Sequence, residues 1–323
     1  ELKMVKNMKK LNFALTLLVA AVMSGNAATE ATSQIVGYQK IALPVGGKNL
    51  APTFVKPDVY RGSAAISGNT VTTSTGALSS LTLGPTTFPV PVLNYPTYYA
   101  EVVSTESPLY GYNFDISSSN TGQSFSSANI PSGLDGQTVQ IAIRPHFTLS
   151  DLDTPSLGDG DVVNMYDSEG LVNTYYKLES GWLDGNGTAG YGHVPIYPGT
   201  GVVITAQAET TLTLVGTVKT TPTAVPLFIS AYANIVAPIN PSTNINYVDQ
   251  NWASAVGDGA AFNVFTTDGT YVESQTYYSL EGGILDANGS VTTSAVVAGG
   301  EAVVVGALSN DTVWLIPGVV VGQ

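Results

Sequence analysis

The chain has 323 residues, a net charge of −13 at neutral pH and no cysteine. The acidic balance disfavours nucleic acid and anionic lipid as partners. The absence of cysteine excludes disulfides, thiolate catalysis and Cys-ligated zinc. Because 44% of the residues are hydrophobic, the chain is long and apolar enough for two domains with their own cores.

The first 28 residues have the pattern of a secretory signal peptide. Lys9 and Lys10 precede a mostly apolar run over 11–23, and small residues lead to Ala28. The run is shorter than the about 20 residues that cross a bilayer, so we expect cleavage near Ala28 and no membrane span afterwards. The sequence therefore predicts a secreted or cell-surface protein.

After this segment the composition is typical of β structure. Val, Thr and Tyr fill the intervals between glycines and prolines, and no long window has helical periodicity. Residues 35–43 and 138–143 predict strands, and residues 59–73 predict a hairpin that turns at Gly68. Residues 104–135 are rich in Ser, Asn and Gly, and we expect them to form long surface loops.

Residues 158–188 and 257–290 are two copies of one motif. Each copy has a Gly-Asp-Gly turn, a strand, an acidic-glycine hairpin turn, a strand with a Tyr-Tyr pair and a Leu-Asp-x-Asn-Gly turn. Each is followed by a short apolar strand after glycine, at 201–206 and 301–305. Such a repeat indicates a duplicated structural unit rather than a duplicated active site.

The repeat predicts the domain organisation. Val36-Gly37 also resembles Val215-Gly216, which suggests that a unit starts at each of these strands. We expect an all-β fold of two tandem β-sandwich or barrel-like units, with a first domain over 29–215 and its repeat over 216–323. The alternative is one large sandwich with a repeated hairpin pair.

An acidic loop is the best candidate for metal binding. Asp151, Asp153, Asp159 and Asp161 stand near glycines, and closely spaced carboxylates on a tight loop suit Ca²⁺. The EF-hand spacing is absent, and the second copy keeps only Asp258, so a solvated turn is the alternative interpretation. No other cofactor is expected.

The tyrosine pairs are the candidates for glycan contact. They are Tyr175-Tyr176 and Tyr277-Tyr278, and on a strand one member of each pair faces the core while its neighbour faces out. Exposed tyrosines together with Trp182 would offer a stacking platform for sugars. The second copy has Ile284 in place of Trp182, so cross-strand aromatic packing is the alternative.

The apolar signal segment, Thr174-Tyr175-Tyr176, Gly181-Trp182 and the stretch from Pro198 to Val203 together resemble a family of secreted proteins from Verrucomicrobia-type bacteria. The second copy departs from this pattern at Ile284 and at Ala298. That family has no established activity. The resemblance implies export from a bacterium and adds no catalytic residue.

No catalytic constellation is present in the sequence. His146 and His193 stand alone, without ligand spacing, and no nucleophile elbow, phosphate loop or dinucleotide fingerprint occurs. We therefore expect a non-enzymatic structural protein of the bacterial surface, in a layer, filament or matrix, with a carbohydrate-binding or adhesion module as the alternative. The strand-like ends, 29–43 and 313–321, are expected to support self-association by adding a strand to a neighbouring copy.

Overall fold

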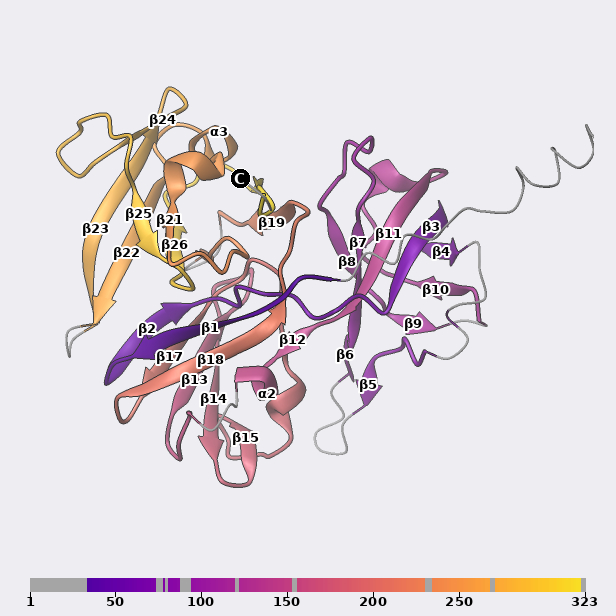
Figure 1. Ribbon diagram of the computed structural model, residues 1–323, viewed down its shortest axis with the longest axis horizontal. Coiled ribbons are helices and arrows are strands. Elements are labelled where there is room, and N and C mark those ends of the chain that lie inside the picture. Colours follow the sequence, from indigo (N-terminus) through magenta and orange to yellow (C-terminus); the bar gives the residue numbers. More distant parts are fainter. Residues whose placement is uncertain are drawn as a thin grey trace, which may run out of the picture. The chain divides into compact units, whose positions relative to one another are not determined.

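The fold consists mainly of β-strands (Figure 1). The computed structural model describes residues 34–73, 78, 81–87, 94–119, 122–152, 156–229, 234–267 and 271–320. Within these ranges the helical elements are short: α2 (Leu149–Leu152), α3 (Trp252–Val256), η2 (Ser132–Leu134), η3 (Tyr191–His193) and η4 (Tyr247–Gln250). The predicted all-β fold is confirmed. The predicted signal peptide lies outside the described residues.

The first five-stranded sheet contains the first copy of the repeat. Its strand order is β15-β14-β13-β17-β2. The strands are β2 (Gly46–Leu50), β13 (Val162–Tyr166), β14 (Val172–Leu178), β15 (Gly181–Asp184) and β17 (Val202–Ala206). Two antiparallel pairs accompany it: β1 (Val36–Leu43) with β18 (Thr210–Thr217), and β12 (Phe147–Thr148) with β16 (Pro195–Ile196).

The core of this part lies on one face of the sheet. Alternate residues such as Val163 and Ile204 point into it, where they pack with Ile41 of β1, Leu212 of β18 and Trp182 of β15. Strand β1 buries Ile41 and Leu43 and exposes Val36 and Tyr38. We call the side away from this core the outer face of the sheet.

The second five-stranded sheet contains the second copy. Its strand order is β24-β23-β22-β26-β20. The strands are β20 (Asn234–Val236), β22 (Ala261–Thr267), β23 (Tyr271–Leu280), β24 (Gly283–Leu285) and β26 (Val303–Gly306). Its accompanying pairs are β19 (Thr223–Leu227) with β27 (Thr312–Ile316), and β21 (Asn244–Asn246) with β25 (Val296–Ala298). Trp252, Phe262 and Trp314 lie in its core.

The two sheets correspond strand by strand. Each strand and each accompanying pair of the first has an equivalent in the second, in the same chain order, and α3 takes the place of α2. The Leu-Asp-x-Asn-Gly turns also match, because Asp184 accepts hydrogen bonds from the N–H of Asn186 and Thr188 as Asp286 does from those of Asn288 and Ser290. The boundary near 215 stays a prediction, since residues 35–323 group as one compact unit.

The strands of a seven-stranded sheet lie between β2 and β12 in the sequence. In the second copy, the equivalent strands β20 and β21 are joined by only a short connection. Its strand order is β8-β7-β11-β3-β4-β10-β9. The strands are β3 (Tyr60–Ser67), β4 (Thr70–Thr73), β7 (Tyr98–Val102), β8 (Asn113–Asp115), β9 (Ser118–Ser119), β10 (Ser124–Ser126) and β11 (Thr138–Pro145). A small pair, β5 (Thr86–Thr87) with β6 (Asn94–Tyr95), precedes β7.

This sheet has its own core, which includes Phe114, Phe125 and Ile141. The predicted hairpin is present, with β3 and β4 joined at Gly68, whose positive φ of 54° suits glycine. Residues 104–135 are more structured than predicted, because they contain β8, β9, β10 and η2. Among the described residues, no helix has the length and apolar character needed to cross a membrane.

The two five-stranded sheets contact each other reciprocally. The N–H of Ala51, just after β2, donates to Gly300 at 3.1 Å, and the N–H of Ala237, just after β20, donates to Gly199 at 3.0 Å. A second pair of bonds repeats the exchange, from Ala302 to Asn49 and from Gly201 to Ile235. Equivalent residues therefore exchange roles, as in an isologous dimer interface.

Candidate functional site

The acidic residues proposed for calcium serve local turns in the structure. Asp151 accepts hydrogen bonds from the Thr148 N–H and hydroxyl and pairs with Lys56 at 2.7 Å. Asp161 is buried and accepts the N–H of Gly158 and of Gln207, each at 2.8 Å.

Asp159 is exposed, and Asp153 lies outside the described residues. In the ranges that the structure describes, no group of three His, Asp or Glu residues is placed to hold a metal ion. The geometry therefore favours the turn interpretation for Asp151 and Asp161, while a role for Asp153 stays a prediction.

The aromatic candidates divide into buried and exposed members. Trp182 is only 2% exposed and belongs to the core, so its predicted place on a sugar-stacking platform is wrong. The reason is the pairing of β15 with β14, which places Trp182 opposite Lys177 and turns its indole inward. Tyr175 and Tyr277 are buried as well.

Their neighbours Tyr176 and Tyr278 are 40% and 41% exposed on the outer faces of the two sheets. The predicted alternation of each tyrosine pair is therefore confirmed. Of the five aromatic candidates, these two are the ones accessible to a partner.

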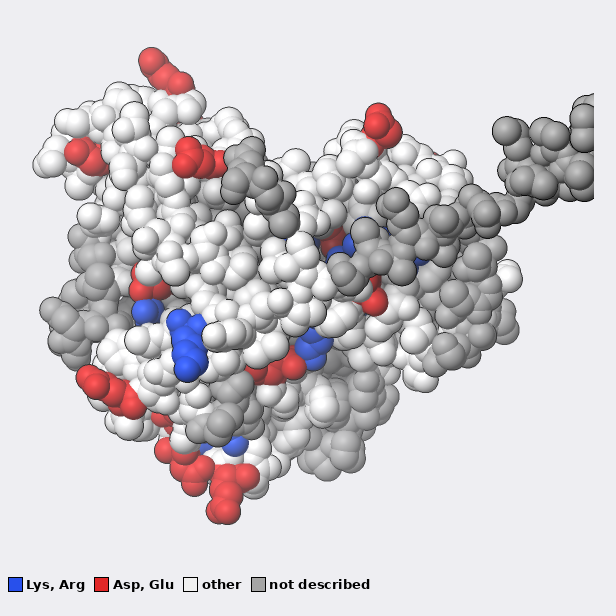
Figure 2. Space-filling model, in the orientation of Figure 1, with Lys and Arg blue, Asp and Glu red and all other residues white. Residues whose placement is uncertain are grey.

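A second exposed apolar surface lies at the N-terminal strand. Tyr38 of β1 stands directly opposite Val215 of β18, and the two side chains are 71% and 58% exposed. Val36 lies two residues before Tyr38 on the same face of β1, and Ile35, also exposed, precedes the strand. We call these four residues the N-terminal strip. Figure 2 shows one face of the molecule, where uncharged residues predominate and several acidic side chains gather along the lower edge of the view.

The structure also forms a histidine cluster that spacing in the sequence does not indicate. His146 is buried, and its Nε2 lies 3.0 Å from Asp115 Oδ1. The other carboxylate oxygen of Asp115 accepts the Tyr197 hydroxyl at 3.1 Å. Nδ1 of His146 is buried without a hydrogen-bond partner. Asp115 ends β8, His146 lies between β11 and β12, and Tyr197 follows β16, so only the tertiary fold brings the three residues together.

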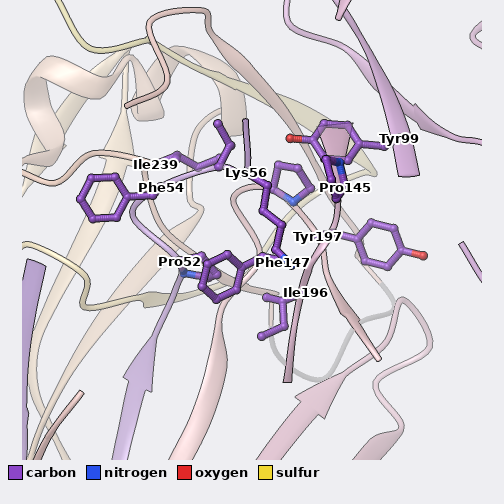
Figure 3. Close-up of a pocket in the computed structure, with 11 residues that line it drawn as sticks. Pro52, Phe54, Lys56, Tyr99, Pro145, Phe147, Ile196, Tyr197 and Ile239 are labelled. Atoms are coloured by element: carbon purple, nitrogen blue, oxygen red, sulfur yellow. The ribbon is translucent and has the colours of Figure 1, made fainter. Parts of the chain in front are cut away.

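Two cavities adjoin this cluster. One, of about 140 Å³, is lined by both histidines, Lys56, Tyr95 and Thr97, among others. The other, of about 10 Å³, has room for about one water molecule. Figure 3 shows this smaller cavity between Phe54 and Phe147 on one side and Tyr99 and Tyr197 on the other. Burial raises the pKa of the Tyr99 hydroxyl well above its usual range.

A buried ionic cluster is the other site that sequence reasoning missed. Glu101 of β7 receives Lys219 at 2.6 Å and Arg144 of β11 at 3.3 Å, and the Thr221 hydroxyl donates to it. Glu101, Arg144 and Lys219 are each less than 5% exposed. The cluster joins the seven-stranded sheet to the segment between β18 and β19.

No protein-family model matches the chain, and comparisons with curated proteins and with solved structures found no match. The candidate sites therefore rest on their own geometry.

Proposed function

We propose that the protein is a secreted, non-enzymatic structural protein of the bacterial surface that associates with copies of itself. The observation that carries this proposal is the N-terminal strip. Isolated exposed apolar residues are common on soluble proteins, whereas large contiguous apolar patches mark interaction surfaces. Export and a bacterial source are supported by the signal-like sequence 1–28 and by the family resemblance.

The strip has the geometry of an association surface. Tyr38 and Val215 form a cross-strand pair in a sheet of only two strands, so the pair lies close to a sheet edge that another strand can extend. On the same two strands, Gly37 faces Gly216 beside Phe54. The core-facing side is thus closely packed, whereas the opposite side carries the apolar side chains in solvent.

The experiment substitutes residues of the strip. Deleting 29–43 is too drastic a test, because Ile41 and Leu43 belong to the core. Instead, Val36→Ser, Tyr38→Ser and Val215→Ser are combined, and the oligomeric state is measured by light scattering and electron microscopy. We expect assemblies in the native chain and smaller ones in the variant. Val59→Ser, at an exposed valine just before β3, is the matched control. A native chain that stays monomeric at all concentrations would contradict the proposal.

Carbohydrate binding is the second candidate function, and the exposure of Tyr176 and Tyr278 favours it. Aromatic faces in solvent can stack on sugar rings. A glycan array with Tyr176→Ala and Tyr278→Ala tests this function. Trp182→Ala is unsuitable as the control, because it opens a cavity in the core.

A further inference from the structure

The outer faces of the two five-stranded sheets carry the same exposed apolar patch. In the first sheet, Tyr176 pairs with Leu183, and Leu178 lies two residues further along β14. In the second, Tyr278 pairs with Leu285, and Leu280 lies two residues further along β23. We call these two sets patch 1 and patch 2. The two tyrosines, Leu178 and Leu280 are at least 37% exposed. Leu183 and Leu285 are half-buried.

The fold does not require these side chains to be alike. The cores of the two copies are similar but not identical, since both keep a buried tyrosine, Tyr175 or Tyr277, while Trp182 in the first is Ile284 in the second. On the outer faces, where a polar residue is ordinary, the copies keep the same tyrosine and the same two leucines. Because polar residues are ordinary at solvent-facing positions, the retained tyrosine and leucines favour a role in binding.

Each patch continues into the contact that the two sheets already make. In the first sheet, Tyr176 pairs with Val162, and two residues along β13 Asn164 pairs with Val203, which is buried in the reciprocal contact. The second sheet has the same series of neighbours. Tyr278 pairs with Ala261, and two residues along β22 Asn263 pairs with Val304, which packs against the same contact. The outer face of each sheet therefore contacts the other sheet of the same chain at one end and is exposed to solvent at the other.

We propose that each patch binds the same kind of patch on another molecule, so that every molecule joins two neighbours. This inference rests on the self-association proposed above and names a second surface for it. One self-complementary patch closes a dimer, whereas two such patches on one chain join each molecule to two neighbours, which gives an open polymer unless the geometry closes a ring. Patches of a few side chains are at the small end of protein interfaces, so we expect polymer length to rise with protein concentration.

The charges around the patches predict the salt dependence of the contact. Exposed Glu179 and Glu281 follow the two leucines of β14 and β23, and Asp184 and Asp286 stand at the adjacent turns. Self-pairing brings like charges together, and salt screens their repulsion. We expect polymers to lengthen as ionic strength rises from about 0.01 M to about 0.15 M, where the Debye length falls from about 30 Å to about 8 Å.

Valency is tested by removing one patch at a time from the full chain. Tyr176→Thr with Leu178→Thr removes patch 1, and Tyr278→Thr with Leu280→Thr removes patch 2. Threonine keeps the β propensity of these outward-facing positions. Leu178→Glu and Leu280→Glu form a second set that adds a like charge to each patch and leaves the core unchanged. Circular dichroism and thermal melting establish that each variant is folded.

In the background of the Val36→Ser, Tyr38→Ser and Val215→Ser variant, size-exclusion chromatography with light scattering at high salt should give polymers when both patches are present, dimers when one patch is removed and monomers when both are removed. Polymers of unchanged length when both patches are removed would overturn the inference, as would monomers in both single-patch variants. Glycan binding that disappears in these variants while the assemblies persist would overturn it too, in favour of the carbohydrate function. If the N-terminal strip variant loses all assembly while both patches are present, the proposed function stands and this inference fails.

Discussion

The carboxylate of Glu101 lies 2.6 Å from the ammonium group of Lys219, and both side chains are withdrawn from solvent. The two residues stand 118 positions apart, one in β7 of the seven-stranded sheet and the other after β18. Because the N–H of Val319 also donates to the carbonyl of Lys219, this short segment ties the seven-stranded sheet to both copies of the repeat.

Loss of one partner of this pair should destabilise the protein strongly. Replacing Lys219 by Met leaves Glu101 buried with Arg144 as its remaining cation, and breaking a buried pair costs about 3–5 kcal/mol. Chemical denaturation of Lys219→Met measures the change in the free energy of unfolding. Lys48→Met, which removes the more exposed ion pair with Glu301, is the control and should cost about 1 kcal/mol or less. Equal losses in the two variants would contradict this prediction.

The same cluster predicts sensitivity to acid. Burial alone would raise the pKa of the Glu101 carboxyl, but Lys219 and Arg144 outweigh it and hold that pKa below its usual value of 4.5. The stabilisation is therefore fully present above about pH 4.5 and is lost as the pH falls through the lowered pKa of the folded state. Thermal melting between about pH 6 and pH 3 measures it. Glu101→Gln should be less stable at neutral pH and should lose less on acidification. If the melting temperature of Glu101→Gln falls with pH as steeply as that of the native chain, Glu101 does not cause the acid sensitivity.

The sequence predicts the strands better than it predicts their partners. Turn residues such as Gly68 and the Asp184 loop mark hairpins, because their chemistry is local. The inward turn of Trp182 follows from its pairing with Lys177, which the sequence does not specify, and the strands within 104–135 are too short for a periodic pattern. The Asp115–His146 and Glu101–Lys219 pairs depend on the tertiary fold alone.

A close approach at glycine explains why the two Val-Gly dipeptides resemble each other. Gly37 and Gly216 are cross-strand partners, and a Cβ on Gly216 would lie 2.7 Å from Phe54 and 2.8 Å from the Val55 carbonyl oxygen. Gly216→Ala should therefore destabilise the protein by about 1–3 kcal/mol through overpacking. Gly158→Ala, where nothing lies within 4 Å of the added carbon, is the control for the intrinsic effect of alanine. A neutral Gly216→Ala would show that the strand moves away from Phe54 at little cost.

Substitution of Asp161 distinguishes between two roles for this carboxylate, a structural one in the turn and that of a calcium ligand. Asp161 is buried and accepts the backbone N–H of Gly158, before β13, and of Gln207, after β17, so it fixes the relation of these two neighbouring strands. Asp161→Asn removes the charge from both hydrogen bonds, and bonds to a charged group contribute about 1.5–3 kcal/mol each. We expect a lower melting temperature in this variant and the same decrease with added Ca²⁺ or with a chelator. Asp159→Asn, at the exposed neighbour, should melt like the native chain. If Ca²⁺ raises the melting temperature of the native chain but not that of Asp161→Asn, the carboxylate is a metal ligand and the turn interpretation is wrong.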